Sequence, residues 1–361
     1  MAIIEIETLA EFENLVALRR DSLHGVRVQA IDLRDHTGTL LSLDTDGMVF
    51  LGCPMDSAAL LHVHETGGLV FPSVPGVPFD PYRPTLYTAD ELYAGLTEKG
   101  YAGTPDALMY EWYQRAEAQH DVFHTLLRAI HDDAMSDALT ELLHDRRVVG
   151  VMGGHKLARG TAEYAAAAHL GRTLARDGLV VATGGGPGAM EAANLGAYLA
   201  PSDDAALDEG LARLGRVPGF ADDVGSWADA GFDIRQTLAP QRAGVTVGVP
   251  TFFYGHEPPN VFASHIAKYF ANSIREDGLL ARSNAGVVVL PGAAGTVQEI
   301  FQAATPSYYA PGDAAPIVLV DREHWTERLP AWPLLRALAS GRGMADRIHL
   351  VDSVDEVPAL L

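Results

Sequence analysis

Short apolar runs alternate with longer amphipathic segments from about residue 146 to the end of the chain. The runs are rich in Val, Leu and Ile, which predicts strands that are buried on both faces. The segments between them have the apolar spacing of helices. This alternation predicts a Rossmann-like α/β fold, a parallel sheet with helices on both faces. The predicted strands are Val148–Met152, Leu179–Thr183, Gly244–Val249, Gly286–Leu290, Ile317–Asp321 and Ile348–Asp352.

The predicted helices lie between these strands. A polar insertion, partly helical, runs from Pro201 to Gln241. The helices are expected at Ala162–Arg176, at Ala189–Leu199, at Asn260–Ala281, from the turn after Leu290 to about Ala304, and at Leu334–Ser340.

The first part of the chain is less regular, and no internal repeat is evident. Thr8 and Glu11 form a capping box that predicts a helix, and β-like runs follow at Val26–Leu33 and Met48–Leu51. Residues from Pro105 to about His144 have the pattern of one or two amphipathic helices. We therefore expect two domains: an N-terminal α+β accessory domain at residues 1–144, and the Rossmann-like domain at residues 145–361.

The net charge restricts the partners of the chain. There are 47 Asp and Glu residues against 26 Lys and Arg, a formal net charge of −21. A surface this acidic repels polymeric nucleic acids and anionic lipid, so neither is an expected partner. There is no apolar run of about 18 residues and no basic, apolar leader at the start, so a cytoplasmic location is expected.

Three glycine-rich turns follow predicted strands, and each precedes a helix. They begin at Gly153, Gly184 and Gly292. Glycine allows backbone N–H groups to approach a ligand closely, and a helix N-terminus adds partial positive charge, so such turns can hold a phosphate without lysine. The second turn fits a dinucleotide motif only loosely, because no acidic residue follows it after a strand, and no Walker motif is present.

The third turn is the most specific of the three. In the segment PGAAGTVQE, Thr296 stands at the start of a predicted helix and Glu299 one turn further on. Positions i and i+3 share a helix face, so the carboxylate and the phosphate donors would point into one pocket.

Two of these stretches together resemble the Lonely Guy (LOG) family, whose members are often labelled lysine decarboxylases. The stretches are VVATGGGPGAMEAANLGA and VVVLPGAAGTVQEIF, and the similarity spans roughly Arg146–Asp321. The segments VVGVMGGH and HEPPN (His256–Asn260) further resemble the bacterial nucleotide 5′-monophosphate nucleosidases of this family.

The resemblance implies a phosphoribohydrolase, which cleaves the N-glycosidic bond of a nucleoside 5′-monophosphate, or of a cytokinin riboside monophosphate, to free base and ribose 5-phosphate. It implies no metal and no organic cofactor. It also implies a homo-oligomer with the active site near the subunit interface. A nucleotide-binding sensor without catalysis is the alternative function.

The resemblance assigns roles to individual residues. Glu299 would meet the ribose and the attacking water, and Arg275 is the best match to the essential arginine of the family, with Arg282 second. Glu257 is a second candidate carboxylate. The other residues expected to bind substrate are Gly153, Gly154, Gly184, Gly185, Gly186, Asn260, Gly292, Gly295 and Thr296.

The chain departs from the family pattern at two positions. Ala293 replaces the second glycine of PGG, and Arg275 lies in SIRED instead of the more usual Met-x-x-Arg-Lys. A methyl group at Ala293 is tolerated only if its φ is negative.

Other chemistries have less support in the sequence. Decarboxylation with pyridoxal phosphate needs a Schiff-base lysine, and Lys156 and Lys268 are the only lysines of the second domain. His62 and His64 would lie on one face of an alternating strand, but they do not form a complete metal-ligand set.

Overall fold

The computed structural model describes residues 4–18, 23–119, 121–239, 243–252, 257–309 and 315–361. The chain divides into two compact units: Met1–Thr85 with His120–Ala138, and Leu86–Gln119 with Leu139–Leu361. This division differs from the single boundary expected at residue 145. Residues 86–119 belong to the second unit because they bond to its sheet region: Tyr87 forms a β-bridge with Ile266, and the Tyr93 hydroxyl donates to the carbonyl of Pro259.

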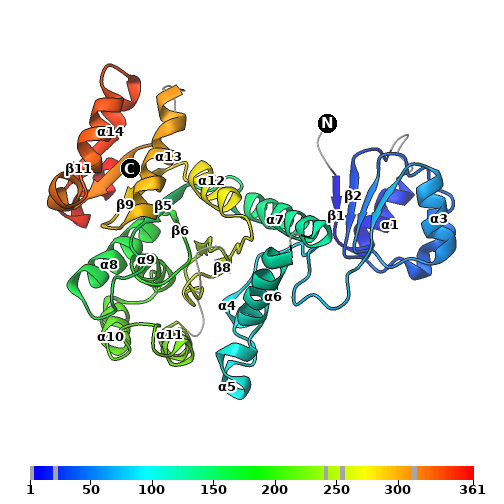
Figure 1. Cartoon of the computed structure of the whole chain (residues 1–361), viewed down its shortest axis with the longest axis horizontal. Helices are drawn as coiled ribbons and strands as arrows, with labels where there is room; N and C mark the ends of the chain where they lie inside the picture. Colours follow the sequence, from blue (N-terminus) through cyan, green and yellow to red (C-terminus); the bar gives the residue numbers. More distant parts are fainter. Residues whose placement is uncertain (1–3, 19–22, 120, 240–242, 253–256, 310–314) are drawn as a thin grey trace. The chain divides into compact units, whose positions relative to one another are not determined.

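The second unit contains a seven-stranded sheet in which every pairing is parallel. The strands lie in the order β11-β10-β9-β5-β6-β7-β8 (Figure 1). This arrangement confirms the predicted Rossmann-like fold class. The strands are β5 (Val148–Met152), β6 (Val180–Thr183), β7 (Thr246–Gly248), β8 (His265–Ile266), β9 (Gly286–Val289), β10 (Ile317–Val320) and β11 (Ile348–Val351).

Helices cover both faces of this sheet. Right-handed crossovers place α8 and α9 on one face and α12, α13 and α14 on the other, because the chain moves across the sheet in opposite directions before and after β8 (Figure 1). The helices of this unit are α4 (Ala89–Leu92), α5 (Leu96–Lys99), α6 (Pro105–Gln119), α8 (Ala162–Arg176), α9 (Ala189–Tyr198), α10 (Asp204–Leu214), α11 (Val224–Leu238), α12 (Asn272–Arg282), α13 (Ala294–Tyr309) and α14 (Ala331–Ala339). Helix α7 (Val122–Leu143) runs from one unit into the other.

Helix α9 is buried along its whole length. Its close packing on α8 requires small residues. A methyl group at Gly196 would overlap the carbonyl oxygen of Ala168, and one at Gly171 would overlap the carbonyl oxygen of Ala193. The two glycines therefore allow the helix backbones to touch, which holds α9 and its N-terminal loop against the sheet.

The helix predicted at Asn260–Ala281 is wrong in its first half. That part contains strand β8, and only Asn272–Arg282 is helical. Strand β8 pairs with β7, and Tyr269 forms a second bridge with Thr251. Tertiary pairing of this buried apolar segment therefore overrides its apparent helical periodicity.

The first unit contains a four-stranded parallel sheet in the order β1-β2-β3-β4. The strands pair at a nearly constant offset, Ile4 with Val26, Arg27 with Val49 and Val49 with Leu69. Each strand leads into a helical turn or helix before the next strand, so successive strand–helix units stack as in a repeat protein. The elements are β1 (Ile4–Ile6), α1 (Leu9–Ala17), β2 (Val26–Gln29), α2 (Thr37–Leu40), β3 (Val49–Leu51), α3 (Ser57–Glu65) and β4 (Leu69–Phe71).

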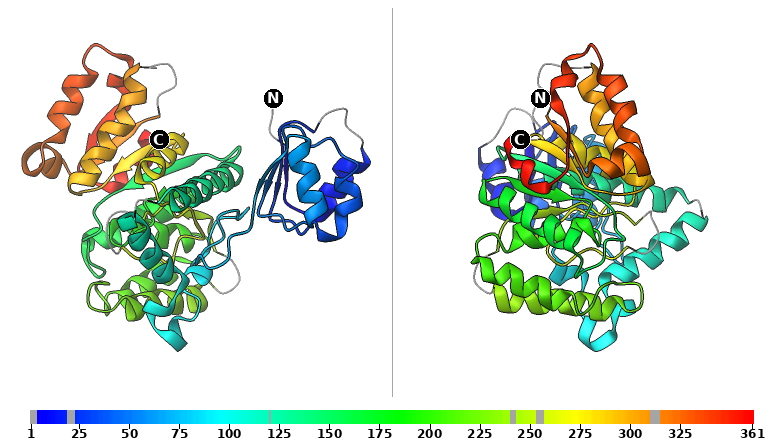
Figure 2. Two further views of the ribbon diagram at one scale, coloured as in Figure 1. Left: turned by 45° about the vertical axis from the view of Figure 1, so that its right-hand side comes forward. Right: turned by 90° about the vertical axis from the view of Figure 1, so that its left-hand side faces the viewer.

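This unit has its own core. Figures 1 and 2 show α1 and α3 on one face of its sheet, where Phe12 and Val63 pack against Val26 and Phe50. Helices and strands are both present, as predicted, but the strands are all parallel, and the arrangement is closer to α/β than to the expected α+β. The predicted capping box at Thr8 is confirmed.

His62 and His64 lie in helix α3, so the expectation of an alternating strand is wrong. Residues two apart on a helix point in different directions.

Within the described residues, none of the helices combines the length and the hydrophobicity needed to cross a membrane.

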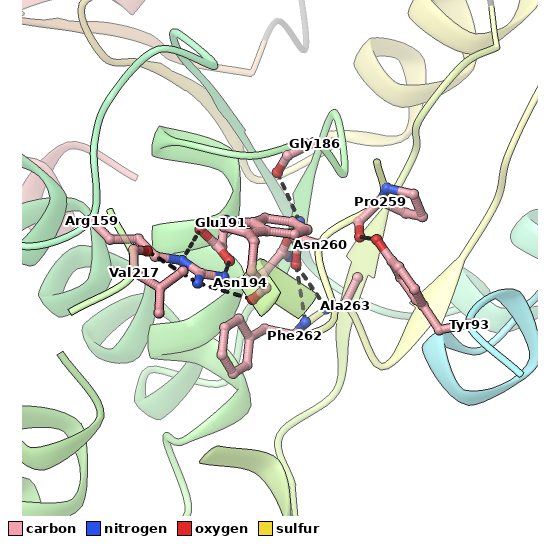
Figure 3. A network of polar contacts seen from close by, with 11 residues as sticks. Tyr93, Arg159, Gly186, Glu191, Asn194, Val217, Pro259, Asn260, Phe262 and Ala263 are labelled. Atoms are coloured by element: carbon pink, nitrogen blue, oxygen red, sulfur yellow. Dashed lines mark hydrogen bonds and ion pairs between the residues drawn. The ribbon is translucent and has the colours of Figure 1, made fainter. Parts of the chain in front are cut away.

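A buried ion pair joins α9 to the insertion. Arg159 donates from Nε to Glu191 Oε2 at 3.0 Å and from Nη1 to the carbonyl oxygen of Trp227 at 3.0 Å (Figure 3). The guanidinium also lies over the Trp227 ring, 4.7 Å from its centre. Each charge is therefore compensated by specific partners, without which it would be buried alone.

Replacing Arg159 with Ala should lower the free energy of unfolding by about 3–5 kcal/mol, because Glu191 would remain buried without its partner. Arg176→Ala is the matched control: Arg176 pairs with Asp204 at 2.8 Å, but on the surface, and its loss should cost at most about 1 kcal/mol. Urea denaturation measures both variants, and equal losses would contradict the role given to the buried pair.

Candidate functional site

The site lies where the direction of the sheet reverses, between β5 and β9. From β5 the chain continues toward β6 and β7, whereas from β9 it continues toward β10 and β11. At such a point the loops after the two neighbouring strands diverge and leave a crevice, where ligands of open α/β sheets bind. Here the loops line a cavity of about 860 Å³. Its lining residues are Gly153, Gly154, His155, Lys156, Leu157, Met190, Glu257, Arg275, Glu276, Pro291, Gly292, Ala293, Ala294, Gly295, Thr296, Glu299 and His324.

The N-terminus of α13 opens into this cavity. The first backbone N–H groups of a helix have no partner within the helix, and here Ala294, Gly295 and Thr296 supply them. A methyl group at Gly295 would meet nothing within 4 Å, so its backbone is open to a ligand. At Gly292 a methyl group would instead overlap the Thr296 side chain. Gly292 therefore lets Thr296 fold back over the turn.

Ala293 fits the turn despite its departure from PGG. Residues other than glycine with positive φ are Ala30, Asp145 and Asp321 among those described, and Ala293 is not one of them. Its side chain is exposed. The backbone of the turn therefore does not require glycine at this position.

Glu299 and Arg275 meet at the inner wall of the cavity. Nη1 of Arg275 donates to Oε1 of Glu299 at 3.3 Å, and Nε donates to the carbonyl oxygen of Val249 at 2.7 Å. Only 7% of Arg275 and 9% of Glu299 are exposed. Gly184 leaves room for this arginine, because a methyl group there would overlap Nη2. The predicted pair is thus brought together, and Arg275 is anchored by two elements at once.

Burial raises the pKa of Glu299, while the positive charge of Arg275 lowers it and the negative charge of Glu276 raises it further. Glu276 lies 3.9 Å from Arg275 and accepts a hydrogen bond from Asn272 at 2.8 Å. The raised pKa favours a carboxyl group that can exchange a proton with a ligand near neutral pH.

The second glycine turn does not open into the cavity. Its helix, α9, receives the carbonyl oxygen of Gly154, to which the N–H of Ala189 donates at 3.1 Å. Gly185 has a φ of +72° and Gly188 a φ of +74°, so these positions require glycine for the turn itself. Gly184, Gly185 and Gly186 are buried and are not lining residues. They shape the wall behind Arg275 and Met190.

Asn260 holds this turn in place. Its side-chain amide donates to the carbonyl oxygen of Gly186 at 3.1 Å and to Oδ1 of Asn194 at 3.0 Å, and its Oδ1 accepts from the N–H groups of Phe262 and Ala263 (Figure 3). Its own N–H donates to the carbonyl oxygen of Gly185 at 2.8 Å. Asn260 is fully buried, so the structure gives it a positioning role and not a place in the cavity.

The remaining predicted residues divide between the cavity and other parts of the unit. Gly153, Gly154 and Glu257 line the cavity, whereas His256 lies outside the described residues. Arg282, the second candidate arginine, does not: it donates to Thr140 Oγ1 at 2.7 Å and to the Gly278 carbonyl oxygen at 3.0 Å.

Several cavity residues were not predicted. His324 follows β10 and approaches the Gly292 carbonyl oxygen to 3.1 Å through Nε2. His155 and Lys156 directly follow the first glycine turn. Their positions after neighbouring parallel strands could have identified them, because the carboxyl ends of such strands share one edge of the sheet.

The two core lysines differ in setting. Lys268 is buried, paired with Asp106 and 4.2 Å from the centre of the Phe252 ring, and burial lowers its pKa. It is not a lining residue, whereas Lys156 lines the cavity with an exposed side chain. Among the described residues no cluster of three or more His, Cys, Asp or Glu side chains is arranged to hold a metal.

Comparison with known families gives two matches, both in the second unit. Residues 146–202 match the SLOG cluster4 family, and residues 234–361 match the family described as "possible lysine decarboxylase". The chain belongs to the LOG, or lysine decarboxylase-like, family. The two matches contain the three glycine turns, Arg275 and Glu299, so this LOG-family chain carries the resemblance on the residues that build the cavity.

No curated protein matches the chain. Among solved structures, the molybdenum cofactor binding protein from Rippkaea orientalis is 19% identical, with 60% of this chain and 96% of that chain covered and a TM-score of 0.37. The molybdenum cofactor carrier protein from Chlamydomonas reinhardtii is 19% identical, with 59% and 94% covered and a TM-score of 0.35. At these values the likeness does not bear on what this LOG-family chain binds.

Glu299→Gln should change how stability depends on pH. Because the pKa of Glu299 is raised in the folded state, wild-type stability should be complete below the ordinary value of 4.5 and should fall as pH rises through the raised pKa. Glutamine does not ionise, so the variant should gain stability relative to wild type from pH 4 to pH 8. Denaturation at both pH values measures the difference. Glu163→Gln, at an exposed position of α8, is the control and should give no such trend.

Proposed function

We propose that this cavity binds a nucleoside 5′-monophosphate and hydrolyses its N-glycosidic bond to free base and ribose 5-phosphate. The observation that carries the proposal is the position of Glu299, which lies one helical turn inside the open N-terminus of α13 and lines the same cavity. A phosphate bound at the helix N-terminus would leave the attached ribose beside this carboxyl group.

The residues fit the chemistry of the reaction. Cleavage of an N-glycoside passes through a ribosyl cation of oxocarbenium character, as in the hydrolysis of other glycosides. A carboxylate close to C1′ stabilises that charge and accepts a proton from the attacking water. Glu299 has the raised pKa of such a group, and Arg275 holds its orientation at 3.3 Å. The phosphate would be bound mainly by backbone N–H groups.

Assays with AMP, GMP, CMP, UMP and isopentenyladenosine monophosphate test the activity by measuring the base that is released. Glu299→Gln should retain affinity for the preferred nucleotide within a few-fold by calorimetry, while turnover should fall by about 10²–10⁴. If the folded wild type binds a nucleotide but releases no base from any of them, the chain is a nucleotide-binding sensor and the hydrolase proposal is wrong.

Gly295→Ala tests the place of the phosphate. The added methyl group meets no protein atom within 4 Å, and alanine favours a helix by up to about 1 kcal/mol over glycine. The free energy of unfolding should therefore be unchanged or slightly higher. KM should nevertheless rise by about tenfold or more, the effect of losing one hydrogen bond to a charged group.

Gly292→Ala is the matched comparison for this change. Its methyl group overlaps Thr296, so both stability and KM should suffer. A Gly295→Ala variant with unchanged KM would show that the phosphate does not lie against the first turn of α13.

A further inference from the structure

A histidine–carboxylate pair crosses the same cavity and has no part in the chemistry described so far. Nδ1 of His155 lies 3.2 Å from Oε1 of Glu257, and the two side chains are 42% and 28% exposed. His155 follows β5 and Glu257 comes from the segment between β7 and β8, so the pair joins loops on both sides of the second glycine turn. Both residues line the cavity that contains Glu299.

The backbone before His155 is held from two sides. The N–H of Gly154 donates to the carbonyl oxygen of Pro291 at 3.0 Å, and its own carbonyl accepts from Ala189 at 3.1 Å. A methyl group at Gly188 would lie 2.8 Å from the carbonyl of His155, so the start of α9 packs directly on this peptide. The imidazole is therefore presented from a constrained turn.

Glu257 is also placed by its surroundings. Its second oxygen, Oε2, faces Gly186, where a methyl group would come within 3.3 Å. Gly186 in turn is held by Asn260 through its carbonyl oxygen at 3.1 Å. A carboxylate that accepts from Nδ1–H of a histidine selects one tautomer, orients the ring and stabilises the imidazolium form. The nitrogen left to face a ligand in the cavity is Nε2.

Hydrolysis of a nucleotide requires two proton transfers at opposite sides of C1′. The attacking water loses a proton on the ribose side, where Glu299 lies, and the departing base leaves as an unstable anion unless one of its ring nitrogens is protonated. Glycoside hydrolysis divides these tasks between two groups for the same reason. Glu299 supplies the first group, and a second one is needed on the side of the base.

We propose that His155, oriented by Glu257, is the acid that protonates the departing base; this role rests on the hydrolase activity proposed above. The proton moves from Nε2 of His155 to a ring nitrogen of the base, and the C1′–N bond breaks with its electron pair on the base. The oxygen of water bonds to C1′, and its proton passes to the carboxylate of Glu299. Both groups then return to their starting states by proton exchange with solvent, so that one nucleotide and one water yield base and ribose 5-phosphate.

The test compares substrates that do and do not need this acid. GMP and other purine nucleotides release a base that must be protonated, whereas 7-methylguanosine 5′-monophosphate already carries a positive charge on its ring and releases a neutral base without an added proton. For His155→Gln, kcat on the purine nucleotide that the wild type hydrolyses fastest should fall by about 10²–10⁴. On 7-methylguanosine 5′-monophosphate it should change by less than about threefold. Equal losses on the two substrates, or no loss on either, would overturn the role of His155.

Variants of the partner and of an unrelated histidine complete the experiment. Glu257→Gln should show the same substrate-dependent loss at smaller size, and Glu257→Asp should restore part of it, because a carboxylate again accepts from Nδ1. His349→Gln, on β11 and not a lining residue, should leave both rates unchanged. If the wild type releases no base from any nucleotide, the hydrolase proposal fails and this role with it; if only the His155→Gln pattern is absent, the hydrolase proposal stands and this role alone fails.

Discussion

The hydrogen bonds of Asn260 are the constraint on which the geometry of the second unit depends. One buried side chain uses all of its hydrogen-bonding capacity to join the second glycine turn, helix α9 and the segment before β8. Asn194 extends the network to Thr246 Oγ1 at 2.6 Å and to Thr183 Oγ1 at 2.7 Å, on β7 and β6. Every member is satisfied by another, and such fully paired networks favour a single arrangement because any displacement leaves a buried polar group unpaired. The wall behind Arg275 is therefore fixed before a ligand arrives.

Electrostatics inside the cavity differ from those of the whole chain. The net charge of −21 repels anions at long range, yet solvent screens surface charges over about 8–10 Å at physiological salt. Within the cavity the nearest groups are the N-terminus of α13, Lys156, Arg275 and the two histidines. Three carboxylates line it as well, but Glu257 faces His155 and Glu299 and Glu276 face Arg275. The acidic side chains are thus paired with cationic partners or histidines, and the backbone dipole of the helix is left for a phosphate.

The sequence predicts the strands, their parallel arrangement and the meeting of Arg275 with Glu299, because each depends on local patterns or on the rule that strand ends share an edge. It does not predict which glycine turn is open. Gly184 and Gly292 look alike in sequence, but only the structure shows that the carbonyl of Gly154 occupies the N-terminus of α9. The stacked strands of the first unit are also missed, because three- and four-residue strands at similar offsets share no recognisable motif. The contact of His155 with Glu257 joins positions 102 residues apart, which no local pattern encodes.

Binding and chemistry fall on different atoms of this cavity. The phosphate donors are backbone N–H groups at the start of α13, which no side-chain substitution removes, whereas proton transfer depends on the carboxyl of Glu299 and the ring of His155. A chain with this fold can therefore lose hydrolysis and keep a nucleotide site by changing one or two side chains. The reverse is more difficult, because a carboxylate placed beside C1′ is useful only if the phosphate first holds the ribose against it. Retention of Glu299 in a buried position, where burial raises its pKa and so makes its ionisation costly, is explained more readily by catalysis than by binding alone.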